Sequence, residues 1–285
     1  MDSIEALARP KLAMCNIFSD VEKLGQFVLD HGFSGIDWSF EAATLPRTPA
    51  DESMWADRLA ALGPLEVRYH CPFHRIDLGH VDSWEAKAAE EIFRNIIRLV
   101  AKVKGQFLTI HIGLGRNSTE PLSWDKTAKN LSRVVQYGAS HGVKVCLENL
   151  AWGWTSRPHL FEKLIRKSGA GVTFDIGHAY ACESINTHQY EIKDFVTPHA
   201  GRVLNAHIYH TELPDRGHVP PERLQDIQGR LAILQGTGCR WWVIEIWDEE
   251  KLLYTKKMLD EYLKHSQYWA ESHHQGSSVD IASQG

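Results

Sequence analysis

Acidic and imidazole side chains recur along this chain directly after short apolar runs. The clearest example is Val172-Thr173-Phe174-Asp175-Ile176-Gly177-His178, in which a carboxylate ends the run and an imidazole follows three residues later. The side chains that end such runs are His70, His111, Glu148, Asp175, His207 and Glu245. Further polar candidates just beyond the runs are His178, Asp215 and His218. Side chains of these types bind divalent cations and transfer protons, so the pattern predicts a metal or acid–base site.

The carboxylates support the prediction of a metal or acid–base site more strongly than the histidines do. Glu148 and Glu245 end runs that we expect to be buried on both faces, and a buried carboxylate needs a partner. A lone histidine such as His70 is more often only hydrogen bonded, and Asp175 alone could cap the segment that follows it. If the three carboxylates meet, they repel one another, and a divalent cation is the simplest way to offset the repulsion. Oxygen-rich ligands with one imidazole suit Mn²⁺, Mg²⁺ or Co²⁺, whereas several histidines favour Zn²⁺.

These side chains lie far apart in the sequence, so the fold must bring them together. Apolar runs alternate with amphipathic segments eight times along the chain. We expect strands at 11–18, 35–38, 65–73, 107–112, 143–150, 172–175, 203–209 and 240–247. We expect helices at 19–31, 51–62, 82–104, 123–141, 158–167, 186–199, 220–235 and 248–264. Strands that alternate with helices form a parallel sheet, and eight repeats in about 250 residues predict an α/β protein, a (β/α)₈ TIM barrel.

The rival fold is a doubly wound open sheet, which usually has a glycine-rich loop after its first strand. Here the first strand runs into Asn16-Ile17-Phe18-Ser19-Asp20, which contains no glycine. We therefore expect one barrel domain over residues 1–268 and a polar tail, without an assigned role, over 269–285. In a barrel the active site lies at the carboxyl ends of the strands, where all the candidates above would converge.

Bulk composition limits the kind of partner. The net charge of −5 gives no global electrostatic footprint for nucleic acid or an anionic membrane. No apolar run approaches the roughly 18–20 residues of a membrane span, and the first residues lack the features of a signal peptide. The five cysteines are scattered without a paired motif, which is typical of reduced thiols. We expect a cytoplasmic protein.

Six short motifs resemble those of a known family. They are Tyr69-His70-Cys71-Pro72-Phe73, Ile110-His111-Ile112-Gly113, Leu147-Glu148-Asn149, Phe174-Asp175-Ile176-Gly177-His178, Ala206-His207 and Ile244-Glu245-Ile246. In order and strand placement, the series is similar to the xylose isomerase-like TIM-barrel superfamily, over roughly residues 11–265. That superfamily includes sugar isomerases and epimerases, sugar-related dehydratases, and endonuclease IV, which cuts DNA at abasic sites.

The ketose epimerases of this superfamily hold one metal ion with ligands from strands five to eight. By position, the resemblance implies Glu148, Asp175, His207 and Glu245 as ligands, with Glu148 and Glu245 also acting as acid and base. A metal bound to a substrate carbonyl and its neighbouring hydroxyl acidifies the C–H between them. One carboxylate then removes the proton, the metal stabilises the enediolate, and the other carboxylate returns a proton.

Endonuclease IV instead holds three zinc ions. The resemblance implies His70, His111 and Glu148 for the first ion and the four ligands named above for the second. The third would take His178, Asp215 and His218. However, Asp215-Arg216-Gly217-His218 has one residue more than the matching motif of that enzyme. His218-Val219-Pro220 matches a His-x-Pro that many sugar-type members keep, so the third zinc site is the weakest part of this alternative.

Aromatic and basic residues near the strand ends bear on the substrate. We expect Trp38, Trp152, Trp154 and Trp247 to rim the pocket, where indole faces stack on sugar C–H groups. Some of them could instead pack between helices. Arg75, Arg116 and Arg216 lie in loops on the same side, where they could bind a sugar phosphate, whereas DNA would require a basic groove.

We therefore interpret the chain as a metal-dependent sugar or polyol isomerase or epimerase with Mn²⁺, Mg²⁺ or Co²⁺. The expected partner is a small sugar-like molecule, with neither nucleic acid nor membrane, and a homo-oligomer is left open. The alternatives are a sugar dehydratase, an endonuclease IV-like zinc phosphodiesterase acting on abasic DNA, and a non-catalytic metal-binding subunit.

Overall fold

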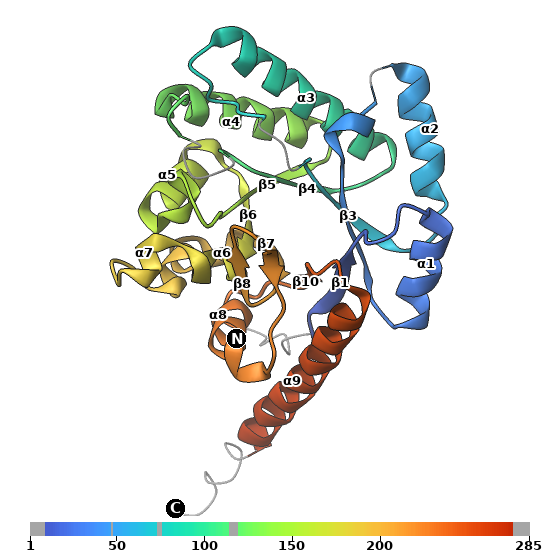
Figure 1. The fold of residues 1–285 in the computed structure, drawn as a ribbon, viewed down its shortest axis with the longest axis vertical. Helices are drawn as coiled ribbons and strands as arrows, with labels where there is room; N and C mark the ends of the chain where they lie inside the picture. The colour runs from blue at the N-terminus through green and yellow to red at the C-terminus, as the bar shows by residue number, and fades with distance from the viewer. Residues whose placement is uncertain (1–8, 47, 73–75, 114–118, 276–285) are drawn as a thin grey trace, which may run out of the picture.

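The barrel predicted from the sequence is present in the computed structural model, which describes residues 9–46, 48–72, 76–113 and 119–275 (Figure 1). Eight parallel strands close in the order β1-β10-β7-β6-β5-β4-β3-β2, and helices surround them. The strands are β1 (Lys11–Cys15), β2 (Gly35–Ser39), β3 (Glu66–His70), β4 (Phe107–Ile110), β5 (Lys144–Glu148), β6 (Gly171–Asp175), β7 (Val203–Ile208) and β10 (Trp241–Ile244). The chain is thus a single-domain TIM barrel, as predicted.

Helices follow the strands and cover the outside of the barrel (Figure 1). They are α1 (Val21–Asp30), α2 (Pro49–Ala60), α3 (Ser83–Lys102), α4 (Trp124–Ser140), α5 (Pro158–Ser168), α6 (Ile176–Ala181), α7 (Glu183–Asn186), α8 (Gln228–Gly236) and α9 (Glu249–Gln275). Asp20, Asp82 and Ser123 accept backbone N–H groups at the starts of α1, α3 and α4. Because an N-cap side chain satisfies otherwise unpaired N–H groups, these residues fix where the three helices begin.

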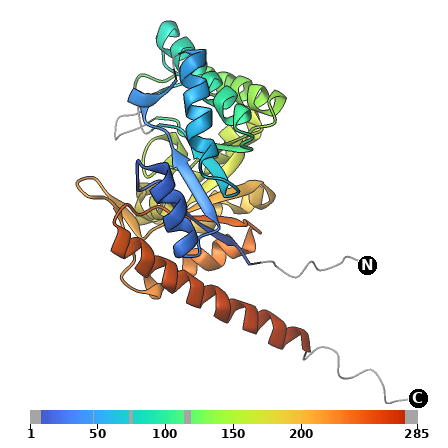
Figure 2. The ribbon, with the colours of Figure 1, turned by 90° about the vertical axis from the view of Figure 1, so that its right-hand side faces the viewer.

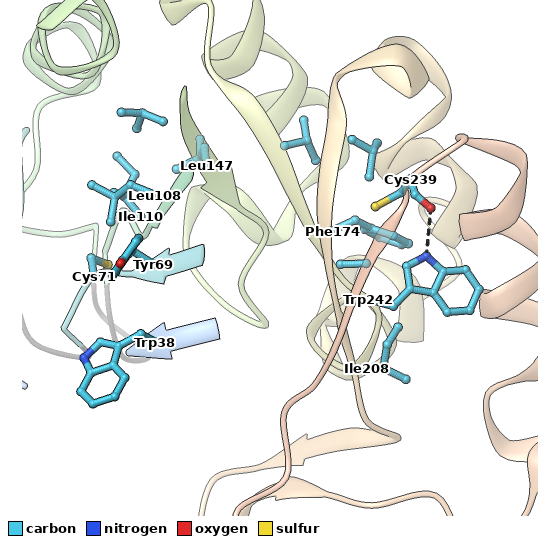
Figure 3. Packing of buried hydrophobic residues seen from close by; sticks show 14 of the residues in the cluster. Trp38, Tyr69, Cys71, Leu108, Ile110, Leu147, Phe174, Ile208, Cys239 and Trp242 are labelled. Atoms are coloured by element: carbon cyan, nitrogen blue, oxygen red, sulfur yellow. Dashed lines mark hydrogen bonds between the residues drawn. The ribbon is translucent and has the colours of Figure 1, made fainter. Parts of the chain in front are cut away.

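Alternate residues of each strand point into the barrel or outward to the helices. The outward residues form the main apolar core, in which Leu108, Leu147, Phe174 and Trp242 are fully buried (Figure 3). The Trp242 indole N–H donates to the Cys239 carbonyl oxygen at 3.2 Å. Burial of this many large apolar side chains is the main term that holds the helices against the strands.

The barrel interior is polar one step below the strand ends. The Thr109 and Thr173 hydroxyls lie 2.7 Å apart, and the Asn205 amide donates to both at 3.3 Å. The Arg68 guanidinium bonds the Asn205 side chain and lies over the Trp241 ring, 4.5 Å from its centroid. These hydrogen bonds join strands across the interior, so they hold the carboxyl ends of the strands in fixed positions relative to one another.

Four segments differ from the expected elements. The helix expected over 186–199 is replaced by the end of α7 and two 3₁₀ segments, since His188 has a positive φ of 56° and interrupts the helix. After Pro220 and Pro221, α8 begins only at Gln228. An unexpected hairpin pairs β8 (Thr211–Leu213) with β9 (Gly217–Val219), and the short α6 directly follows β6.

The last helix is longer than the sequence pattern indicated. We expected it to end near Lys264, but α9 continues to Gln275 and extends beyond the rest of the fold in both views (Figures 1 and 2). It therefore includes residues 269–275 of the segment expected to be a tail, and 276–285 lie outside the described residues. None of the described helices combines the length and apolarity that crossing a bilayer requires. The five cysteines are buried free thiols.

Candidate functional site

The carboxyl ends of four neighbouring strands bring together the metal ligands expected from the resemblance. Glu148 ends β5, Asp175 ends β6, His207 lies in β7, and Glu245 directly follows β10. One ligand atom from each lies within 4.8 Å of the others, and all four residues are buried. The His207 Nδ1 atom lies 3.1 Å from a Glu245 oxygen, 3.3 Å from a Glu148 oxygen and 3.7 Å from an Asp175 oxygen. One imidazole nitrogen thus faces three carboxylates.

Burial and neighbouring charges set unequal pKa values in this cluster. Desolvation opposes the charge of Glu148, but His207 and His111 hold its pKa well below the ordinary value. Desolvation acts on Glu245 as well, and His207 and His218 lower its pKa. Burial raises the pKa of Asp175. For His207, the carboxylates of Glu245 and Glu148 overcome desolvation and raise the pKa well above its usual value. Without a cation, the imidazolium compensates the carboxylate charge.

The donor set fits a divalent cation. Three buried carboxylates and one imidazole offer mostly oxygen ligands, which suits Mn²⁺, Mg²⁺ or Co²⁺. The Asp175 Oδ1 atom accepts the His178 backbone N–H at 2.6 Å, whereas the buried Oδ2 atom has no hydrogen-bond partner among the described residues. The Asn149 side chain joins the Asp175 backbone at 2.9 Å in both directions and so fixes the end of β6 beside β5. The Asp175 Oδ2 atom lies 3.2 Å from His178 Nδ1 in an ion-pair contact, and a buried oxygen without a hydrogen bond can bind a cation.

Two further donor groups flank these four residues. His70 and His111 each point Nε2 at the same Glu148 oxygen, at 3.1 and 2.9 Å, and the three residues form one candidate group. On the other side, His178 forms a group with His218 and Glu212, with His178 Nε2 2.6 Å from a Glu212 oxygen. Both groups contain histidine pairs, which would favour Zn²⁺ if they held ions.

The group with His178 and His218 contains Glu212, whereas the resemblance to endonuclease IV implied Asp215. Within the described residues, Asp215 belongs to none of the candidate groups. The β8–β9 hairpin pairs Glu212 directly with His218, which puts both on one face of the ribbon. Gly217 has a positive φ of 64° and lies where the chain leaves the turn. Because glycine adopts such a conformation readily, this residue was the feature of the sequence that could have predicted the hairpin.

A second residue that sequence reasoning missed is Asp37. It lies in β2, is buried, and has a carboxylate oxygen 3.3 Å from the Nε2 atom of His207. Asp37 could have been predicted as a site residue because it is an acidic residue within a short apolar strand, and a buried carboxylate needs a partner.

A cavity of about 740 Å³ opens over the cluster. Glu148 and Glu245 line its floor, while Arg216 and Trp247 line it farther out. Trp247 is half exposed, and its ring centroid lies 5.4 Å from that of His218. The volume suits a small molecule that reaches the buried carboxylates.

The other tryptophans lie elsewhere. Trp38 belongs to the apolar core (Figure 3) and is only 2% exposed. Its ring packs edge-on against Trp55, so the expectation that it rims the pocket is wrong. Trp152 and Trp154 line a separate cavity of about 720 Å³, which shares Glu212 with the first. Arg75 and Arg116 lie outside the described residues.

Comparisons with known proteins agree with this geometry. A family model described as xylose isomerase-like TIM barrel matches residues 26–272. The chain belongs to this family. An uncharacterised protein of Methanocaldococcus jannaschii, MJ0008, is 29% identical over 199 residues, which are 70% of this chain and 80% of that protein.

Solved structures of this xylose isomerase-like fold include both sugar epimerases and a nuclease. A D-tagatose 3-epimerase-like protein superposes with a TM-score of 0.69 at 17% identity, covering 91% of this chain and 99% of its own. An L-ribulose 3-epimerase has the same TM-score and identity, with 96% and 100% covered. Endonuclease IV from Thermus thermophilus gives 0.64 at 16% identity, with 90% and 100% covered. At these identities the likeness establishes the fold and not the reaction.

Proposed function

We propose that the protein is a divalent-metal-dependent sugar or polyol isomerase or epimerase. The observation that carries the proposal is the buried cluster of three carboxylates and one imidazole on the floor of an open cavity. The fold similarity to ketose epimerases adds support. The cavity over the cluster is large enough for a small sugar, and Trp247 offers an indole face at the edge of this cavity.

In this proposal the side chains have separate roles. Glu148, Asp175, His207 and Glu245 hold the cation, which when bound would polarise a substrate carbonyl and acidify the neighbouring C–H. Glu245 lines the cavity, so its carboxylate is placed to accept a substrate proton as the general base. Glu148 also lines the cavity, and after taking a proton from solvent its carboxyl group would return that proton to the substrate. His70 and His111 hold one Glu148 oxygen in place.

Exchange of a substrate C–H with solvent tests the proposal. Ketoses and inositols are incubated with the Mn²⁺-loaded protein in deuterated water, and deuterium in the recovered compound is measured by mass spectrometry. We expect incorporation with the wild-type chain and a loss of roughly 10²-fold or more with Glu245→Gln, since a general base contributes about 10²–10⁴-fold. The control is Glu249→Gln, because Glu249 is exposed on α9. Undiminished exchange in Glu245→Gln would remove the acid–base assignment.

A second candidate is a zinc phosphodiesterase similar to endonuclease IV. The groups His70–His111–Glu148 and His178–Glu212–His218 favour it, because together with the central cluster they provide three of the four candidate ligand sets found among the described residues. Counting metal by elemental analysis separates the two functions: one ion per chain supports the isomerase, and three zinc ions with cleavage of abasic DNA support the nuclease. A non-catalytic metal-binding subunit would give neither deuterium incorporation nor cleavage.

A further inference from the structure

Asp37 is a buried carboxylate beside the cluster that has no part in the proposed chemistry. We infer that Asp37 is a positioning residue, which holds the proton of His207 on Nε2 so that Nδ1 is free to bind the cation. The inference rests on the metal site in the proposed function but on neither the substrate nor the reaction.

The strand pattern places Asp37 inside the barrel. Its neighbours in β2, Ile36 and Trp38, belong to the outer apolar core, so the residue between them points inward. In the barrel order, β2 lies between β1 and β3, whereas β7 lies between β10 and β6. The contact between Asp37 and His207 therefore crosses the interior and joins strands that are not neighbours.

The two nitrogens of His207 have different surroundings. Nδ1 faces the carboxylates of Glu148, Asp175 and Glu245, while Nε2 faces Asp37 at 3.3 Å. A neutral imidazole carries one proton, so a ring that gives its Nδ1 lone pair to a cation must carry that proton on Nε2. In the described part of the chain, Nε2 makes no hydrogen bond, and the Asp37 carboxylate, in ion-pair contact at 3.3 Å, is the carboxylate that faces it.

A purely structural role for Asp37 would require a cationic partner inside the barrel. Arg68 is the adjacent residue on β3 in the strand register. Its guanidinium nitrogens instead bond the Leu204 carbonyl oxygen and the side chains of Asn205 and Glu66. The Oδ1 atom of Asp37 has no hydrogen-bond partner among the described residues. His207 is thus the charged contact through which Asp37 acts, and carboxylates placed behind a ligand histidine fix its tautomer and raise its basicity.

Metal affinity of the full-length chain tests this role without any substrate. Wild type, Asp37→Asn and a control variant compete with a chromophoric chelator for Mn²⁺ and for Zn²⁺. We expect Asp37→Asn to weaken binding by roughly 10–100-fold, as for other partners of ligand histidines. The control is Cys146→Ser, a change of similar size at a buried free thiol on β5. Thermal unfolding of the metal-free proteins checks that both variants are folded. If Asp37→Asn does not fold, Asp37→Ala replaces it in the competition experiment.

A spectroscopic readout separates positioning from a general structural effect. With ¹⁵N-labelled histidine and bound Zn²⁺, the His207 signals, assigned with His207→Gln, should show an Nε2–H in wild type and a disturbed signal in Asp37→Asn. Unchanged affinity and signals in Asp37→Asn, or an equal loss in Cys146→Ser, would overturn the inference. Metal binding without deuterium exchange would contradict the isomerase proposal alone. A wild-type chain that binds no metal would contradict both the isomerase proposal and the role inferred for Asp37.

Discussion

His207 is the side chain on which the charges of the cluster converge. Its imidazole is fully buried, with Asp37 on one nitrogen and Glu148, Asp175 and Glu245 around the other. A ring in this position compensates negative charge as an imidazolium, or it binds a cation as a neutral ligand, but not both at once. In the proposed metal site, a proton and the cation would therefore compete for the Nδ1 atom of His207.

This competition predicts a pH-dependent metal affinity. Desolvation lowers the pKa of His207, but the carboxylates of Glu245 and Glu148 outweigh it and raise this pKa well above its usual value. Below that pKa the cation must displace a proton, so apparent affinity should rise with pH by up to about tenfold per unit and level off above the pKa. Titration with Mn²⁺ between pH 6 and 9 checks this, with His141→Gln, an exposed histidine at the end of α4, as the control. A flat profile in wild type would contradict the competition.

Some of these residues could be predicted from the sequence and others could not. Glu148, Asp175, His207 and Glu245 were found because each ends an apolar run, and the barrel gathers strand ends at one face. Glu212 was missed because its place depends on a hairpin of two three-residue strands, which has almost no apolar pattern. Asp37 was missed because its partner lies across the barrel interior, a contact that no local pattern encodes.

At the scale of elements, close approach between strands limits which residues fit. Gly35, at the start of β2, packs against the neighbouring strand and under the Trp241 ring. A Cβ atom there would lie 2.1 Å from the Glu66 carbonyl oxygen and 2.7 Å from Trp241. Since the first of these is backbone, the barrel itself would have to move.

Gly35→Ala should therefore destabilise the protein. We expect a loss of about 2 kcal/mol or more in the free energy of unfolding, measured by urea denaturation, because overpacking a closed barrel strains it. The matched change is Gly229→Ala in α8, where an added Cβ has nothing within 4 Å. That variant should be neutral or stabilised by up to about 1 kcal/mol. Similar stability in both variants would argue against the tight contact between β2 and β3.

The element boundaries differ in how well local signals define them. The starts of α1, α3 and α4 follow from their capping side chains Asp20, Asp82 and Ser123. The region after β6 had no comparable signal, because α7 and the 3₁₀ segments there are short and depend on tertiary contacts. The end of α9 was also underestimated, since its apolar pattern fades before the helix does.

For the whole molecule, the proposed metal site would couple metal content to stability. Three carboxylates that a cation would neutralise repel one another without it, although the imidazolium offsets part of this. Binding to the folded state alone stabilises it by about 2.7 kcal/mol at one hundred times the dissociation constant. Chelation with EDTA should lower the midpoint of thermal unfolding, and Mn²⁺ should restore it, while KCl of equal ionic strength should not. Equal midpoints with and without metal would mean that the cluster holds no ion.

The proposed ligands come from β5, β6, β7 and the residue after β10, the last strand of the barrel in sequence. A nascent chain emerging from the ribosome therefore lacks a complete ligand set until residue Glu245 has been synthesised and the final strand has docked between β1 and β7. If the cluster holds the proposed cation, its complete ligand set forms only at the end of synthesis, when docking of the final strand closes the barrel.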